Sequence, residues 1–363
     1  DSHIRNYYAD EQIYAGYGML DIEYDPFTLM AGIRAEFSNM DYDGRKVEFN
    51  RFGQFDSVKN TSATNSYMNL FPNARLLYQI NDQSEIHLAY SKTIRRPDFQ
   101  MLNPFVLALP QDTLLYAGNT ELDPLKADNF DLGWNYAFSN KGFISVNVFF
   151  KSLSDYIDLR EDELTIQRDE YPVFNGLFED GENQITIHQQ KFQNSSNNAT
   201  LYGVELAIQN ELNFLPGVLS NLSAKANYTY SQAEFDGDRS ETTALPGQSP
   251  HVVNAAVNYK QDRFSAQLSY HWTAEMLTNL QETAQDAPSI GNNPMYLDRY
   301  QDGYSDLSAS LSYQLSDEVQ LWANIYNLLF TEQIEYAENR EFYPTSIYKR
   351  EGIEFNAGVR FSL

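Results

Sequence analysis

The sequence predicts an all-β protein, an antiparallel β-barrel that spans a membrane. Three observations favour it: apolar and polar residues alternate along many segments, most of these segments are about ten residues or longer, and short and long connections alternate between them. In 264–276, Phe264, Leu268 and Trp272 fall on one face, and Gln267 and His271 fall on the other. Because successive side chains of a strand point to opposite faces, such a segment is predicted to be a strand with one apolar face.

Thirteen segments follow this pattern. Their lengths exceed the roughly 5–6 residues usual in soluble sheets and suit a tilted strand that crosses a bilayer. No segment has a helical period, and no run of about 18 apolar residues is present that would form a transmembrane helix. The predicted strands lie near 10–24, 27–38, 67–79, 84–94, 126–138, 142–155, 199–211, 221–235, 250–260, 263–276, 304–315, 318–328 and 347–363.

The connections between these segments alternate in length. Short ones lie at 25–26, 81–83, 139–141, 213–220, 261–262 and 316–317, and long ones at 39–66, 95–125, 156–198, 236–249, 277–303 and 329–346. This alternation predicts tight turns at one end of the wall and long loops at the other. Bacterial outer-membrane barrels have this arrangement, with the short turns in the periplasm. A soluble β protein also alternates apolar and polar residues, but it has no reason to gather its long loops at one end.

The composition excludes several other classes of protein. A net charge of −25 leaves no basic face for nucleic acid, whose phosphates require cationic partners. The absence of cysteine excludes disulfide scaffolds, thiolate metal sites and a cysteine nucleophile. Aromatic residues make up 14 % of the chain, which argues against disorder.

The apolar faces are expected to meet lipid, with Tyr and Trp near the strand ends as interfacial girdles. The opposite faces are polar, and a charged side chain on the lipid face would cost about 2–4 kcal/mol near the bilayer centre. We therefore expect a polar lumen, which also explains a mean hydropathy of −0.51 in a membrane protein. The charged or ionisable residues predicted to face the lumen are Asp131, Lys151, Glu205, Lys225, His271, Asp306, Glu354 and Arg360.

Several segments, taken in order, resemble the barrel of the TonB-dependent outer-membrane receptors. They are 70–79, 87–99, 102–105, 118–126, 129–133, 201–206, 227–231, 245–251, 324–328 and 358–361. Each motif is weak by itself, whereas the ordered set is specific and covers nearly the whole chain from about residue 10. The resemblance implies location in the bacterial outer membrane.

The resemblance also implies a 22-stranded barrel closed by an N-terminal plug domain. Residues 1–363 would then be the C-terminal portion of the barrel, with the plug and the first strands absent from this sequence. Thirteen strands also fit poorly as a barrel of their own, because single-chain bacterial barrels have even strand numbers and an open edge in lipid leaves backbone groups unpaired. Either a longer polypeptide or a second chain would complete the wall. The family typically ends on an aromatic residue that the barrel-assembly machinery reads, whereas this chain ends on Leu363, with Phe361 two residues earlier.

Two groups of loop residues are candidates for contact with a ligand. Arg95 and Arg96 end a predicted strand and suit a carboxylate or phosphate, although pairing with neighbouring carboxylates is the favoured interpretation. Aromatic side chains on the long connections suit stacking on a sugar or a chelate, and loop self-packing is the alternative. The aromatic candidates are Phe99, Tyr116, Tyr171, Tyr296 and Tyr300.

Other chemistry has little support in the sequence. The acidic stretch 155–182 lacks the spacing of an EF-hand, so a solvated surface is favoured over a Ca²⁺ site. The histidines are scattered, and no catalytic motif is present. We expect no enzyme activity, no catalytic residue, no metal site and no cofactor.

By resemblance, the favoured function is active uptake of a scarce solute across the outer membrane. The TonB–ExbB–ExbD complex would supply the energy through the plug, and a surface lipoprotein is a further candidate partner. An oligosaccharide is slightly favoured as the solute over a ferric siderophore or vitamin B12. The alternatives are a structural or partner-docking barrel subunit of a multi-chain outer-membrane complex and, third, a passive porin.

Overall fold

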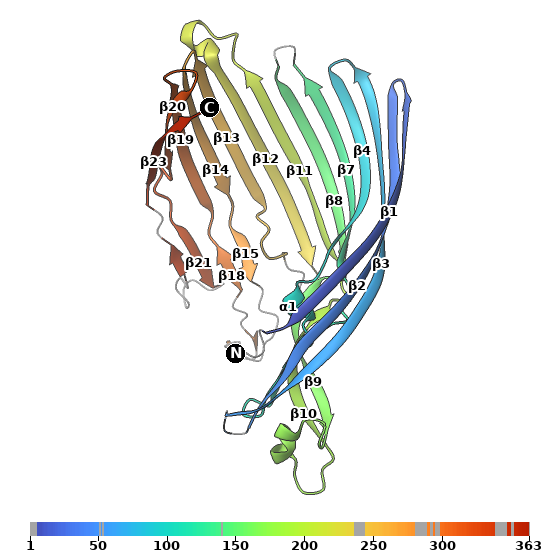
Figure 1. Cartoon of the computed structure of the whole chain (residues 1–363). Coiled ribbons are helices and arrows are strands. Elements are labelled where there is room, and N and C mark those ends of the chain that lie inside the picture. The colour runs from blue at the N-terminus through green and yellow to red at the C-terminus, as the bar shows by residue number, and fades with distance from the viewer. Residues whose placement is uncertain are drawn as a thin grey trace.

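The computed structural model describes residues 6–50, 52, 54–138, 141–235, 244–279, 289–290, 293–294, 298–337, 347–349 and 352–362. Most of them form strands, and the longest strands stand side by side in a tall, curved wall (Figure 1). Three short helices interrupt the connections in the described part of the chain: α1 (Phe99–Leu102) and the 3-10 helices η1 (Pro172–Leu177) and η2 (Gly217–Asn221). No helix among the described residues is long and apolar enough to cross a membrane.

The wall is a continuous antiparallel ladder in which each strand pairs with the next one listed here. Each of the predicted strand segments overlaps one of these strands. In spatial order they are β1 (Tyr8–Tyr24), β2 (Phe27–Phe49), β3 (Phe55–Asn81), β4 (Ser84–Arg95), β7 (Leu125–Ala137), β8 (Phe143–Ser154), β11 (Ala199–Glu211), β12 (Leu222–Phe235), β13 (His251–Gln261), β14 (Phe264–Thr273), β19 (Tyr304–Gln314), β20 (Val319–Tyr326) and β23 (Glu354–Phe361).

The two ends of the wall differ as the alternation of connections predicts. The tight turns lie at one end, called here the turn end, and the long connections leave from the opposite, loop end (Figure 1). At the turn end, Asp262 takes a positive φ of 50° in the turn between β13 and β14. The predicted turn residues 139–140 lie outside the described residues.

The structure corrects the prediction of loops at 39–66 and 156–198. Strand β2 continues to Phe49 and pairs with β3 as far as Phe55, so a long hairpin replaces the first of these loops. The second contains another hairpin, β9 (Ile157–Gln167) with β10 (Gln184–Asn194). Both hairpins carry polar residues on both faces for much of their length, and such strands lack the alternation by which a half-buried strand is recognised.

The last predicted strand, 347–363, is also wrong in extent. It divides into β22 (Ile347–Lys349), which pairs with β21 (Gln333–Ala337), and β23. Together with β15 (Met276–Asn279) and β18 (Arg299–Gln301), β21 and β22 form a separate four-stranded sheet at the loop end. Two more short strands, β16 (Ser289–Ile290) and β17 (Asn293–Pro294), pair only with each other among the described residues.

The register of the wall separates an apolar face from a polar face. Asn227, Asn254, His271 and Asp306 stand opposite one another across β12, β13, β14 and β19. The neighbouring row, which points to the other face, is Ala226, Ala255, Tyr270 and Leu307. Followed strand by strand, the register places all eight predicted lumen residues on the polar face; their contact with a water-filled lumen stays a prediction.

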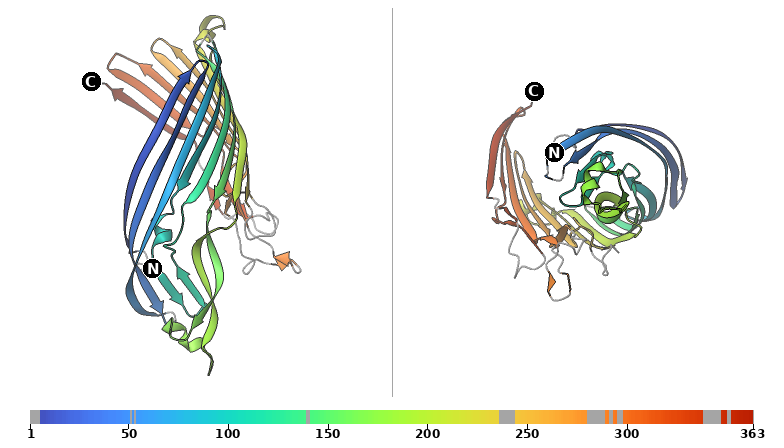
Figure 2. Two further views of the ribbon diagram at one scale, coloured as in Figure 1. Left: turned by 90° about the vertical axis from the view of Figure 1, so that its right-hand side faces the viewer. Right: turned by 90° about the horizontal axis from the view of Figure 1, so that it is seen from below.

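The polar face is the concave one. Segments that include α1, β9 and β10 lie within the curve of the wall when the molecule is seen along its axis (Figure 2). Leu102 of α1 and Leu122 both lie in the connection between β4 and β7. They pack against Met40 and Tyr42, whose side chains point to the polar face of β2. The convex face therefore carries the exposed apolar side chains, such as Leu268 and Val359, which are 47 % and 51 % exposed.

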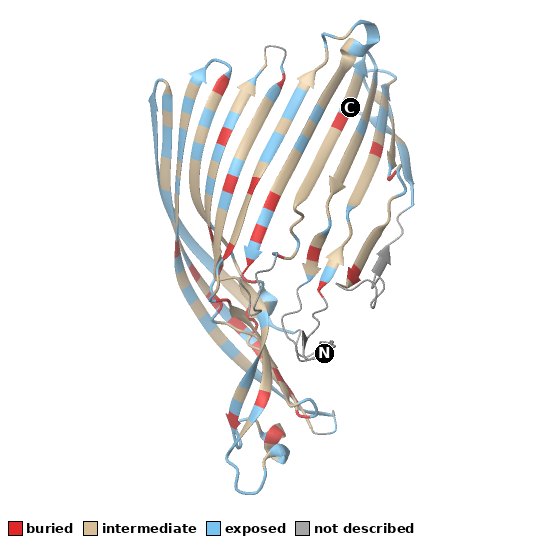
Figure 3. Ribbon diagram, turned by 180° about the vertical axis from the view of Figure 1, so that it is seen from behind, coloured by how far each residue is buried: buried red, intermediate tan, exposed pale blue. Residues whose placement is uncertain are grey.

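Buried residues are sparse along the wall and gather toward the loop end (Figure 3). A single sheet has no second layer to pack against, so most side chains on both of its faces stay partly exposed in this chain. The hydrophobic clusters that do form combine residues from the connections with the loop ends of strands.

A matched pair of substitutions on β11 tests the assignment of the two faces. Leu206 points to the convex face and is 42 % exposed, whereas Ala207 points to the concave face between Ser145 and Asn227. Leu206→Arg is expected to lower the free energy of unfolding in lipid by about 2–4 kcal/mol, because its charge enters hydrocarbon. Ala207→Arg is expected to change it by less than about 1 kcal/mol. Urea titration of the protein in bilayers measures both values, and equal losses would contradict the assignment.

Candidate functional site

The main sheet continues at the loop end into a group of paired strands that we call the cap sheet. It consists of β5 (Val106–Leu109), β6 (Leu114–Ala117), β9, β10 and the tip of β2 at 46–48. Strand β5 pairs in parallel with β2 and antiparallel with β6, and β6 pairs in parallel with β10. Segments from three different connections thus share one hydrogen-bonded sheet, which fixes their positions relative to one another.

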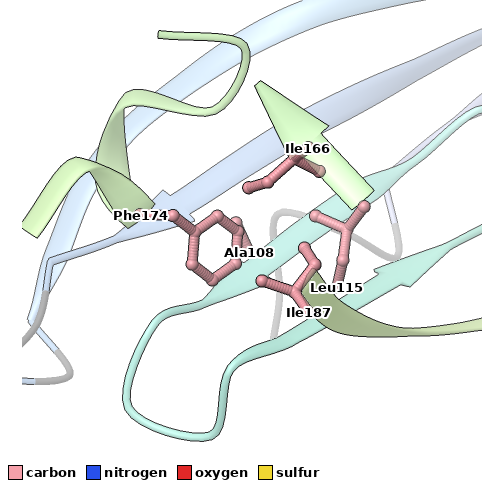
Figure 4. Packing of buried hydrophobic residues seen from close by; sticks show 5 residues of the cluster. All are labelled: Ala108, Leu115, Ile166, Phe174 and Ile187. Atoms are coloured by element: carbon pink, nitrogen blue, oxygen red, sulfur yellow. The ribbon is translucent and has the colours of Figure 1, made fainter. Parts of the chain in front are cut away.

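The cap sheet has a hydrophobic core of its own. Ala108, Leu115, Ile166, Phe174 and Ile187 are 0–1 % exposed and pack together (Figure 4). Phe174 comes from η1, which covers this face of the sheet. Burying a side chain of the Leu, Ile or Phe type contributes about 1.5–3 kcal/mol each, so this core holds the cap sheet in one arrangement.

An ion pair between the partly exposed Lys46 and the buried Glu48 borders this core. Lys46 Nζ lies 3.1 Å from Glu48 Oε1 and 4.3 Å from the centre of the Tyr171 ring. Ser57 Oγ donates a 2.9 Å hydrogen bond to Glu48 Oε2. Burial alone would raise the pKa of Glu48, but the hydrogen bonds from Lys46 and Ser57 and the charges of Lys46 and Lys59 hold that pKa below its ordinary value. Burial also raises the pKa of the Tyr171 hydroxyl.

Asparagine side chains tie the connection 96–124 to its surroundings. Asn65 Nδ2 donates to the carbonyl oxygen of Thr120 at 2.7 Å, and Asn119 Nδ2 donates to that of Phe192 at 2.9 Å. Asn194 Nδ2 donates to the carbonyl oxygen of Asp123, also at 2.9 Å. Because these bonds reach both β3 and β10, the connection is held between the wall and the cap sheet.

The two candidate arginines differ in their surroundings. Arg96 forms ion pairs with Glu36 and Glu11, and its Nε lies 3.4 Å from Glu11 Oε1. Arg34 also pairs with Glu36, at 2.7 Å. Arg96 therefore has the carboxylate pairing that the sequence favoured. Arg95 is exposed, and contact of either arginine with a ligand stays a prediction.

The aromatic candidates do not form one cluster. Phe99 lies on α1 and is 42 % exposed. Tyr116 belongs to β6, and Tyr171 packs against the core of the cap sheet. Tyr300 lies in the separate sheet of β15, β18, β21 and β22, where its ring stacks on Tyr336 at 5.8 Å. Tyr296 lies outside the described residues.

Hydrogen bonds link polar side chains across the concave face. Asn254 Nδ2 donates to Asn227 Oδ1 at 2.8 Å, and His271 Nδ1 lies 2.7 Å from Asn254 Oδ1. Asp306 accepts hydrogen bonds from the backbone of Asn327 at 2.9 Å and from Ser308 Oγ at 2.6 Å. This face therefore offers a hydrophilic surface of cross-strand hydrogen bonds.

The other predicted lumen residues make local contacts on the same face. Asp131 Oδ1 accepts from Asn147 Nδ2 at 3.3 Å, and Arg360 donates to Gln320 Oε1, also at 3.3 Å. Glu354 Oε1 accepts from Asn356 Nδ2 at 2.7 Å, and Lys151 Nζ lies 5.9 Å from the centre of the Phe149 ring. Glu205 stands opposite Asn147 and Thr229, and Lys225 stands opposite Gln209 and Ala256. Within the part of the chain that the structure describes, no group of three or more His, Asp or Glu side chains is placed to hold a metal ion.

Comparison with known proteins identifies the family. The family model described as the β-barrel of TonB-dependent-receptor-like proteins matches residues 3–328. The chain belongs to the TonB-dependent receptor family. It lies in the bacterial outer membrane, so its convex face meets lipid. Since the short turns of such barrels face the periplasm, the loop end and the cap sheet face the outside of the cell.

Solved structures share the fold at low sequence identity. The ferric-catecholate import receptor Fiu of E. coli K12 superimposes with a TM-score of 0.66 at 15 % identity, over 98 % of this chain and 45 % of Fiu. The copper transporter OprC has a TM-score of 0.64 at 17 % identity, over 98 % and 49 %. The Serratia marcescens hemophore receptor HasR, in complex with its hemophore HasA and heme, has a TM-score of 0.61 at 13 % identity, over 97 % and 51 %.

The chain thus spans about half the length of these receptors, which at such identities are evidence of the fold alone. No curated protein matches the chain by sequence.

The ion pair of Glu48 predicts that the stability of the cap sheet depends on pH. Because its pKa in the folded protein lies below the ordinary value of 4.5, the carboxylate adds stability above that pH, and this contribution is lost as the pH falls through the folded pKa. Glu48→Gln is expected to lower the local stability of β5 and β6 by about 1–3 kcal/mol at neutral pH. Hydrogen–deuterium exchange, corrected for intrinsic rates, should show a difference from the unsubstituted protein that shrinks below pH 4.5. A difference that does not change with pH would contradict this role.

A pair of glycines tests whether the connection 96–124 requires its close packing. A Cβ at Gly118 would lie 1.8 Å from the carbonyl oxygen of Asn103, whereas a Cβ at Gly176 would meet nothing within 4 Å. Gly118→Ala is expected to destabilise this connection by about 1–3 kcal/mol, and Gly176→Ala to have an effect within about 0.5 kcal/mol. Limited proteolysis of whole cells should cleave between α1 and β7 faster only in Gly118→Ala. Equal cleavage of the two variants would show that the close approach is dispensable.

Proposed function

We propose that this chain forms part of a TonB-dependent transporter that takes up a scarce solute across the outer membrane. The family match over residues 3–328 is the observation that carries the proposal. The hydrogen-bonded concave face supports it, because a solute path needs a hydrophilic wall. Fiu is titled an import receptor and OprC a transporter, which agrees with this function.

We further propose that residues 1–363 are the C-terminal portion of a 22-stranded barrel, whose plug and first strands lie outside this sequence. Among the described residues, β1 pairs in the wall only with β2, and β23 only with β20. Backbone groups in hydrocarbon need partners within protein, so further strands would complete both edges. The TonB–ExbB–ExbD complex would act through the plug, the barrel-assembly machinery would insert the barrel, and no catalysis is involved.

For the solute, the proposal places an oligosaccharide ahead of a ferric siderophore or vitamin B12. The exposed aromatic ring of Phe99 and the ring of Tyr300 at the loop end support it, because a flat ring stacks well on the apolar face of a sugar. Both lie on the side of the wall where a solute would first meet the receptor.

A second candidate function is the docking of a partner protein, such as a surface lipoprotein. The cap sheet favours it, because a sheet with its own core presents a fixed surface to the outside of the cell. The complex of HasR with its hemophore HasA shows that a structural neighbour of this chain binds a protein.

Uptake assays test the proposed transport. Cells that express the receptor should accumulate one solute from a panel of labelled oligosaccharides, ferric siderophores and vitamin B12. Accumulation should fall to background when either the receptor gene or tonB is deleted, because active uptake needs the energised plug. Accumulation that persists without TonB would instead indicate a passive porin.

The mass of the native polypeptide tests the proposed division of the barrel. A denatured mass of about twice 41.8 kDa would support one chain that carries plug and barrel. A mass of 41.8 kDa would overturn the single-chain barrel and direct the search to a second chain.

A further inference from the structure

A cavity of about 490 Å³ lies on the concave face near the turn end of the wall. It spans β13, β14, β19, β20 and β23, which stand side by side (Figure 1). Since the short turns face the periplasm, the cavity lies toward the periplasm, at the opposite end of the wall from Phe99 and Tyr300. The side chains that carry the argument below are Asn258, Ser265, Gln267, Ser312, Trp322 and Asn324.

Trp322 is the one tryptophan on the concave face. The chain has three tryptophans, and all of them lie among the described residues. Followed through the register, Trp134 and Trp272 point to the convex face, which meets lipid. Trp322 points to the other face, where it stands between Ser312 of β19 and Gly358 of β23. A large ring with two small neighbours therefore faces the interior of the curved wall.

The glycine at position 358 makes room for this ring. A Cβ at Gly358 would lie 2.8 Å from Trp322 Cζ2 and 3.0 Å from its Cε2. The indole thus occupies the space that a side chain at this position would take, and it leans across β23. Its position is set before any solute arrives, and a ligand that stacks on a preplaced ring loses less entropy on binding.

Small and amide side chains surround the ring on its other side. Ser312 and Ser265 follow one another across β19 and β14, and their hydroxyl oxygens are 2.6 Å apart. Because both side chains are short, they form the floor of the cavity beside Trp322. Hydroxyl and amide groups each donate and accept hydrogen bonds. The amide side chains that line the cavity next to this floor include Asn258, Gln267 and Asn324.

Resting on the proposed uptake of an oligosaccharide, we propose that this cavity is a sugar-binding subsite on the path by which the solute leaves toward the periplasm. A sugar has a flat apolar face and hydroxyl groups that both donate and accept. Its apolar face would stack on Trp322, and its hydroxyls would bond to Ser265, Ser312 and the neighbouring amides. Lys260 and Arg360 also border the cavity, so an acidic sugar is a second form of the same ligand.

The position of the subsite sets its expected strength. A path conducts only when each site binds well enough to admit the solute and weakly enough to release it. The subsite at the turn end is therefore expected to bind sugar more weakly than the sites that first capture the solute at the loop end.

Fluorine NMR of the complete native polypeptide tests the proposal. The protein is labelled with fluorotryptophan and kept in detergent micelles without any energy source. The resonances of Trp322, Trp134 and Trp272 are assigned by replacing each residue in turn with Phe. Titration with maltotriose, cellotriose and trigalacturonate is expected to shift the Trp322 resonance with at least one sugar. The resonances of the two lipid-facing tryptophans should stay in place and serve as internal controls.

Substitutions of the cavity floor and of the ring support sharpen the test. Ser312→Leu fills the space beside the ring, and Gly358→Ala displaces the ring while keeping it. Each is expected to raise the sugar concentration needed for half of the Trp322 shift by about tenfold. The matched control is Ser145→Leu, which makes the same exchange on the concave face between Asn135 and Ala207 and should leave that concentration unchanged. Heat-dependent mobility on electrophoresis checks that each variant is folded.

A Trp322 resonance that no sugar shifts would overturn the proposal, including the case in which other parts of the complete protein cover the ring. Equal effects of Ser312→Leu and Ser145→Leu would also overturn it, because the response would then belong to the whole concave face. Calorimetry on the same samples keeps this test apart from the proposed solute. Heat of sugar binding without a shift at Trp322 would remove the subsite and leave the oligosaccharide in place, whereas neither heat nor shift with any sugar would contradict both.

Discussion

The structure depends first on the need of every backbone N–H and C=O in hydrocarbon for a partner within protein. The antiparallel ladder from β1 to β23 meets this need strand by strand, with each wall strand bonded to its neighbours. This constraint explains why the strands are long and why the turns between them are tight at one end. It is also the physical basis of the additional strands proposed at the two edges of the wall.

Because side chains alternate along each strand of this ladder, the wall has two faces with different properties. The convex face holds residues such as Leu206 and Leu268 against lipid and needs no specific contacts. The concave face connects its polar groups, as in the series Asn227, Asn254 and His271, so that it is hydrogen-bonded and ordered without a packed core. In the proposed transporter, specific recognition is thereby left mainly to the loop end, where the chain leaves the wall.

The connections at the loop end are packed differently beside β2 and beside β12. On the side of β2, three connections share the cap sheet and bury a common core around Phe174, so the outer surface has a fixed shape. On the side of β12, the ladder to β13 ends at His251, and a short segment held by Gln248 frames an open cavity. The first arrangement presents a broad, fixed surface, and the second leaves a cavity between the strand ends.

The sequence by itself determined the wall, because period-2 alternation is a local signal that survives in every half-buried strand. Segment 199–211 was predicted with the bounds that β11 has, and the pairing of Arg96 with carboxylates was the favoured interpretation. Only the tertiary structure decided the loop end. The contact of Lys46 with Tyr171, and of Leu115 with Ile187, joins residues far apart in the sequence. Strands with polar residues on both faces, such as much of β9, show no apolar–polar alternation. Their positions depend on packing between residues far apart in the sequence, which a local pattern does not contain.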